Sequence, residues 1–119
     1  MDTVNFITIE TGDDLILSFS FDEGTRFGVD GFIIQRTPKF ELFLKPGERG
    51  PSIGWTDDDE RILIKKVNVT PREVLIETTR DKHIFDLSKI SGEEYSDMVT
   101  VLKKMNVDNV FDLKIQRQS

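Results

Sequence analysis

Apolar and polar residues alternate along most of the chain, and this period of two predicts β-strands. In residues 14–21, DLILSFSF, every second residue from Leu15 to Phe21 is leucine or phenylalanine, while Ile16 and two serines lie between them. The same signal predicts strands in residues 4–10, in both arms of a hairpin within 31–44, and in 61–69, 73–79 and 82–88. Because the turns between these stretches are short, we expect an antiparallel meander of about seven strands, as a sheet or a partly open barrel.

The period changes to that of a helix after residue 90. Ser91 and Glu94 have the S-x-x-E spacing of a capping box, in which each side chain satisfies a free backbone amide at the start of a helix. Apolar residues then recur at helical spacing: Tyr95, Met98, Val99, Leu102 and Met105. Two lysines in the last turn suit the negative end of the helix dipole, and Asn106 is a suitable stop. Alternation resumes in residues 110–115, which predicts a last strand.

These elements indicate an α+β fold in a single domain, residues 1–119, with one amphipathic helix packed on the sheet. A chain of 119 residues is long enough to bury a core. The residues that we expect to be mostly buried are Leu15, Leu17, Phe19, Phe40, Leu42, Tyr95, Met98, Val99 and Leu102.

The negative charge is concentrated at the start of the chain. Residues 1–31 contain seven acidic residues and one base, Arg26, and this excess equals the whole net charge of −6, because the remaining residues carry fifteen of each sign. An acidic zone repels nucleic-acid backbones and anionic lipid and attracts basic surfaces. We therefore expect a basic protein partner, no nucleic acid and no membrane; net charge that only keeps the chain soluble is the alternative.

Several chemistries lack the residues they need. The chain has no cysteine and one histidine, His83, which alternates with apolar residues in a predicted strand. No thiolate nucleophile, disulfide, histidine pair or glycine-rich phosphate loop is present, so we expect neither an enzyme nor a cofactor. The first residues lack the basic and apolar segments of a secretory signal, which together with the absence of cysteine favours the cytoplasm.

The stretch GWTDDDE, residues 54–60, places the only tryptophan beside four consecutive acidic residues. The stretch does not match a calcium loop of the EF-hand type, which needs glycine at its sixth position: with Asp57 as the first position, the sixth is Ile62. We expect no metal and interpret the stretch as a partner surface, with a solvated turn or a turn that caps the core as alternatives. The residues expected to contact the partner are Trp55, Asp57, Asp58, Asp59, Glu60, Asp13 and Asp14.

Three stretches together resemble a known family. They are GFIIQR (31–36), the glycine loop and hairpin GPSIGWTDDDERILIKKVNVTPREVLIE (50–77), and FDLSKISGEEYSDMVTVLKKM (85–105). Their succession resembles the bacterial immunity proteins of polymorphic toxin systems, in particular the family called immunity protein 10, over residues 14–105. The resemblance implies a cytoplasmic protein that binds a cognate toxin and blocks it, and it assigns no site residues.

A pleckstrin-homology-like adaptor is the alternative, because seven strands followed by a helix also describe that architecture. The acidic start of the chain disfavours the binding of phosphoinositides, which needs a basic rim, and leaves the binding of a peptide open.

Overall fold

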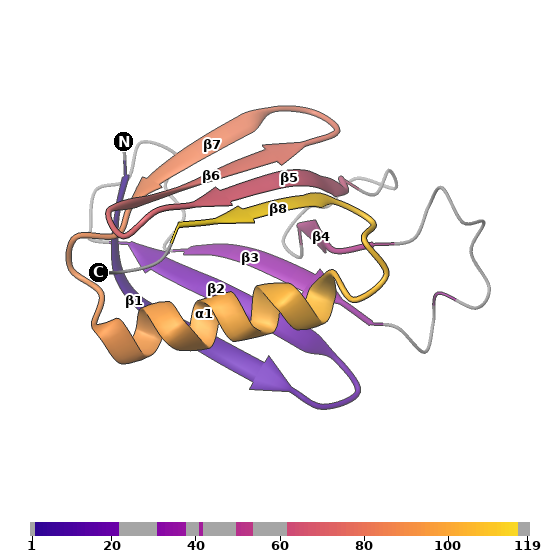
Figure 1. Cartoon of the computed structure of the whole chain (residues 1–119), viewed down its shortest axis with the longest axis horizontal. Helices are drawn as coiled ribbons and strands as arrows, with labels where there is room; N and C mark the ends of the chain where they lie inside the picture. The colour runs from indigo at the N-terminus through magenta and orange to yellow at the C-terminus, as the bar shows by residue number, and fades with distance from the viewer. Residues whose placement is uncertain (1, 22–30, 38–40, 42–49, 54–61, 117–119) are drawn as a thin grey trace.

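The computed structural model describes residues 2–21, 31–37, 41, 50–53 and 62–116. These residues form eight strands and one helix: β1 (Asp2–Thr11), β2 (Leu15–Phe21), β3 (Gly31–Arg36), β4 (Ser52–Ile53), β5 (Ile64–Val69), β6 (Glu73–Thr78), β7 (Lys82–Asp86), α1 (Gly92–Met105) and β8 (Asp112–Ile115). The fold is α+β, as expected (Figure 1).

The sheet is mixed, which corrects the expectation of a purely antiparallel meander of about seven strands. Its strand order is β4-β3-β2-β1-β7-β6-β5-β8. Two antiparallel meanders, β1 to β3 and β5 to β7, are joined where β1 runs parallel to β7, with Thr3 opposite Asp86. Strand β8 is parallel to β5, because helix α1 carries the chain back along the sheet before β8 begins.

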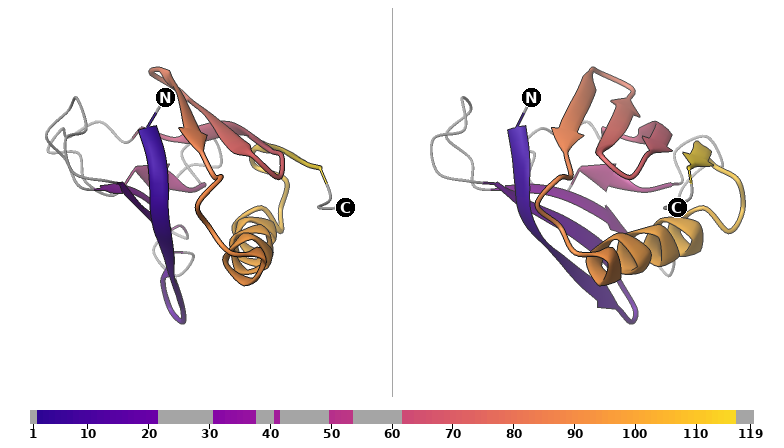
Figure 2. Two further views of the ribbon diagram at one scale, coloured as in Figure 1. Left: turned by 90° about the vertical axis from the view of Figure 1, so that its left-hand side faces the viewer. Right: turned by 60° about the vertical axis from the view of Figure 1, so that its left-hand side comes forward.

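The fourth strand of the described residues is one that the alternation does not predict. The predicted strand in 39–44 falls outside the described residues except for Glu41, and β4 is the two-residue strand Ser52–Ile53. The chain just before β5 pairs with β4: the Ile53 amide donates to the Ile62 carbonyl at 3.1 Å, and the Ile64 amide donates to Pro51 at 2.9 Å. These bonds draw the two halves of the bent sheet together (Figure 2).

The core fills the space between the two halves of the sheet and helix α1, which lies across the open side (Figure 2). Of the residues expected in the core, Leu17, Phe19, Tyr95, Met98 and Leu102 are buried. The other two described ones, Leu15 and Val99, are half-buried and pack against its margin. Phe40 and Leu42 lie outside the described residues.

Helix α1 begins and ends where the sequence predicts. Ser91 is the N-cap, its hydroxyl accepts from the Glu94 amide, and the Glu94 carboxylate accepts from the Ser91 amide at 3.1 Å. Asn106 is the C-cap. The second oxygen of Glu94 accepts from the Ile7 amide of β1 at 2.8 Å, so one carboxylate caps the helix and fixes it to the sheet. No helix in the described part of the chain is long and apolar enough to cross a membrane.

Glu94→Gln is expected to lower the free energy of unfolding at pH 7 by about 1 kcal/mol, because an amide has only one acceptor oxygen for two backbone donors. Burial alone would raise the pKa of Glu94, but hydrogen bonds from Ile7 and Ser91 outweigh it and lower the pKa below its ordinary 4.5. The stabilisation is therefore present above the ordinary pKa and lost as the pH falls through the folded value.

The measurement is urea unfolding of wild type and variant at several pH values between 7 and 3. The difference between them should shrink as the pH falls and wild-type Glu94 takes up a proton. Glu93→Gln, an exposed neighbour in the same helical turn, is the control and should change stability little. A Glu94→Gln effect that is independent of pH would contradict the assignment.

Candidate functional site

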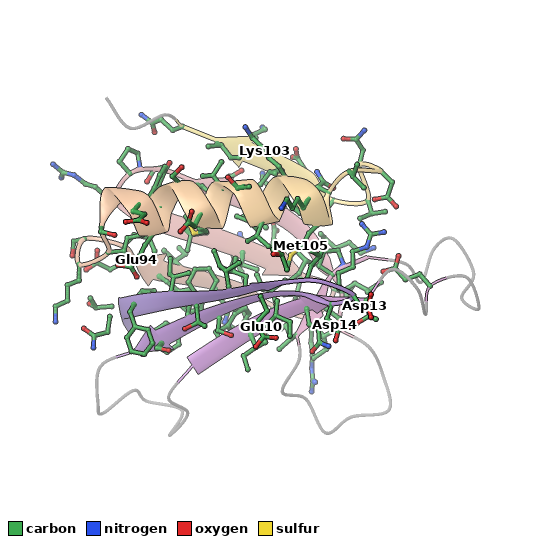
Figure 3. All side chains as sticks on the ribbon, turned by 90° about the horizontal axis from the view of Figure 1, so that it is seen from below. Glu10, Asp13, Asp14, Glu94, Lys103 and Met105 are labelled. Carbon is green, nitrogen blue, oxygen red and sulfur yellow. The ribbon has the colours of Figure 1, made fainter. Side chains whose placement is uncertain are left out.

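The β1–β2 hairpin carries acidic residues and no basic one. Residues 2–21 contain four acidic residues and no lysine or arginine. At the turn Asp13 is exposed, and Asp14 is half-buried and accepts a hydrogen bond from the Thr37 hydroxyl at 2.6 Å. Glu10 is exposed on β1 just before the turn. Glu10, Asp13 and Asp14 gather at the end of the hairpin near which α1 finishes with Met105 (Figure 3).

The outer face of strands β1, β2 and β3 adjoins this acidic turn. Register and alternation place these residues on it: Phe6, Thr8, Glu10, Ile16, Ser18, Ser20, Ile33 and Gln35. Phe6 is 50% exposed, and it is the one exposed large apolar side chain among the described residues of this face. The only base in these three strands is Arg36, which is buried on the opposite face. The described residues of this face therefore offer apolar and hydroxyl groups beside carboxylates, and none of them is a lysine or arginine.

Of the seven residues expected to contact a partner, the structure describes Asp13 and Asp14. Trp55 and the acidic residues 57–60 lie outside the described residues, and their role stays a prediction. The residues at the two ends of that segment, Ile53 and Ile62, are joined by the hydrogen bond between β4 and the chain before β5.

Arg36 forms the main buried polar cluster of the described residues. Its guanidinium donates to Glu41 at 2.7–3.2 Å, to both oxygens of Asp108 at 2.8 Å, and to the Met105 carbonyl. The hydrogen bonds that Arg36 donates to Asp108, and secondly those to Glu41, raise the pKa of Arg36 above its ordinary value. All five N–H donors are used, so no donor remains for a ligand, and the cluster is structural.

This cluster holds the acidic end of the molecule in place. It ties the end of β3 to Glu41 and to the turn that follows α1, and Glu41 also accepts from the Gly50 amide at 3.3 Å. Thr37, the next residue after Arg36, holds Asp14. One feature of the sequence indicates this cluster: Arg36 continues the alternation of Phe32 and Ile34, so its charged side chain is expected to point into the core.

A second surface is a groove of about 720 Å³ between helix α1 and strand β8. Among its lining residues are Tyr95, Ser96, Val99 and Lys103 of the helix and Leu113 and Ile115 of the strand. Val99, Leu113 and Ile115 are half-buried, so apolar surface remains open in the groove. The Tyr95 hydroxyl donates to the Gln116 carbonyl, and burial raises the pKa of this hydroxyl. The sequence does not reveal the groove, because the helical spacing of Val99 predicts a core residue.

The histidine has a packing role within the described residues. The His83 ring lies 4.8 Å from the Phe32 ring and its Nε2 lies 2.9 Å from the Asp81 carboxylate. Among the residues described, no group of three or more His, Cys, Asp or Glu side chains is placed to hold a metal ion.

Comparison of the chain with protein-family models, with curated proteins and with solved structures finds no match to any of them.

Proposed function

We propose that this chain is a non-catalytic cytoplasmic binding protein that neutralises a cognate bacterial toxin by direct contact, as the resemblance to immunity protein 10 implies. The observation that carries the proposal is the acidic β1–β2 hairpin, which has no basic residue from position 2 to 21 and ends in exposed Asp13. A segment that carries carboxylates and no lysine or arginine attracts a basic partner and speeds its encounter. A toxin that acts on nucleic acid is such a partner, because it must itself attract phosphate.

The outer face of β1, β2 and β3 supplies apolar contact in addition to charge. Charge pairs at the rim of an interface act mainly on the association rate, whereas apolar anchors at its centre slow dissociation. Phe6, half exposed on the face next to the acidic turn, has the size and position of such an anchor. Trp55 and residues 57–60 are proposed to belong to the same partner surface.

Charge removal on the hairpin tests the contact. The double variant Glu10→Gln/Asp13→Asn is expected to slow association with the partner about three- to tenfold and to weaken the salt dependence of the rate. Glu93→Gln/Asp97→Asn is the matched control, because it removes two exposed carboxylates near the start of α1, at the other end of the hairpin from the acidic turn (Figure 3), and should change the rate less than about twofold. Asp14 is left intact because it holds Thr37.

The partner for these measurements is the protein that the wild-type chain retains from its native cells, purified and measured by surface plasmon resonance at several salt concentrations. Growth is the second readout: cells that express the partner should stop growing and recover when the chain is co-expressed. A partner without toxicity would contradict neutralisation while leaving binding intact. Equal association rates for the two double variants would contradict the hairpin as the contact.

A peptide-binding adaptor is the second candidate. The groove between α1 and β8 favours it, because β8 is the last strand of the sheet that the described residues form, and an apolar groove beside such a strand is a common site for extended peptides.

A further inference from the structure

Strand β8 ends the described sheet and has one unpaired edge. It pairs with β5 on one side and with no other described strand. The Gln116 amide donates to the Val69 carbonyl of β5 at 2.7 Å. Because backbone groups alternate along a strand, the amides and carbonyls of Leu113 and Ile115 point away from β5. Such an edge presents donors and acceptors to another extended chain.

The groove lies directly beside this edge. The side chains of Leu113 and Ile115 form its wall on the strand, and Val99 faces them from the helix. Ser96, Thr100 and Gly92 are the small residues of the helix wall, so a chain that lies along β8 can approach α1 closely. An added strand would therefore direct every second side chain into the groove.

Charge distinguishes one end of the groove. Lys103 lines it near the C-terminus of α1 and makes no ion pair with any described residue. Helix and strand run in opposite directions, so Lys103 marks the end at which β8 begins, and Tyr95, bonded to Gln116, marks the other (Figure 1). Residues 92 to 103 of a helix span about 16 Å, which equals about five extended residues.

We propose that the groove between α1 and β8 binds an extended segment of a partner protein, which adds to β8 as a strand. Two apolar side chains, two positions apart, fill the groove over Val99, Leu113 and Ile115. A carboxylate, from an acidic residue of the segment, pairs with Lys103. This surface lies on other elements than the acidic hairpin, so the inference does not depend on the proposed toxin contact.

The first test selects binders from a phage-displayed library of random octapeptides against the full chain. Synthetic forms of the enriched peptides are then measured by isothermal titration calorimetry. Enrichment of alternating apolar residues followed by an acidic residue is expected. No enrichment over an unrelated protein, or enriched peptides without this pattern, would overturn the proposal.

Paired variants locate the binding site. Ser96→Trp fills the groove and should weaken the selected peptides at least about tenfold, whereas Asp97→Trp, the exposed neighbour outside the groove, should change affinity less than about twofold. Lys103→Glu should weaken them about tenfold and Lys104→Glu less than about twofold. Equal effects within either pair would overturn the proposal.

A test on the peptide does not depend on how the variants fold. Single N-methylation removes one backbone donor at a time, and only alternate amides of an added strand face β8. Methylation should abolish binding at every second position within about five residues and leave it unchanged between them. An effect without this period of two would overturn strand addition.

Discussion

Arg36→Met is expected to lower the free energy of unfolding by about 3–5 kcal/mol, because it leaves the buried Glu41 carboxylate without its cation. Arg36 is 5% exposed, and the Glu41 side chain is 8% exposed. A buried carboxylate that loses its partner must either stay charged in a poor solvent or take up a proton, and both cost free energy. Methionine retains much of the volume of the arginine stem, so the expected loss comes from the charge cluster rather than from a cavity.

Guanidinium-chloride unfolding at pH 7 measures this effect. The double variant Arg36→Met/Glu41→Leu is expected to be about 1–3 kcal/mol more stable than Arg36→Met alone, since it removes the stranded charge as well. Asp108→Asn is expected to cost less than Arg36→Met, because the Asp108 side chain is 47% exposed and water can solvate what remains. A loss below about 1 kcal/mol in Arg36→Met would show that the cluster does not hold this end of the fold.

The Arg36 cluster lies next to the acidic turn that is proposed to contact the partner. Arg36 fixes the end of β3, and Thr37 next to it holds Asp14 in the acidic turn. Glu10→Gln/Asp13→Asn removes charge without touching these bonds, so a slower association in that variant cannot come from loss of the Arg36 cluster or of the bond between Thr37 and Asp14. If Arg36→Met is less stable but binds the partner at the wild-type rate, the Arg36 cluster supports the fold and the contact does not depend on it.

The local elements could be predicted from the sequence because their signals depend on near neighbours. The S-x-x-E spacing and the apolar stripe are contained within helix α1, and the alternation of β2 is contained within seven residues. The parallel pairs could not be predicted this way. The pairing of β1 with β7 joins Thr3 to Asp86, and no turn connects them to reveal it. Strand β4, with two residues, is too short to show an alternation.

The candidate surfaces divide in the same way. The acidic hairpin is visible in composition, because Asp13 and Asp14 follow a run without any base. The groove is not, since it exists only where α1 lies beside β8, and Val99 has the same helical spacing whether it faces a core or an open groove. Arg36 could be predicted in part. The alternation of β3 predicts that its side chain points inward, but nothing near it in the sequence identifies Glu41 and Asp108 as its partners.

Phe19→Ala is expected to lower the free energy of unfolding by about 3–5 kcal/mol, the range for a buried phenylalanine whose site cannot collapse. Phe19 is fully buried, and its ring lies 5.6 Å from Phe85 of β7 and 6.5 Å from Phe32 of β3, so it joins the two halves of the sheet. Phe6→Ala on the adjacent strand is the matched control: the same atoms are removed from a side chain that is 50% exposed, and the loss should stay below about 1 kcal/mol. Thermal and urea unfolding of the two variants compare them directly. Equal losses would place Phe6 in the core as well and remove it as the anchor of the proposed partner surface. A large difference, together with faster dissociation of the partner from Phe6→Ala, would show that Phe19 stabilises the fold and that Phe6 contacts the partner.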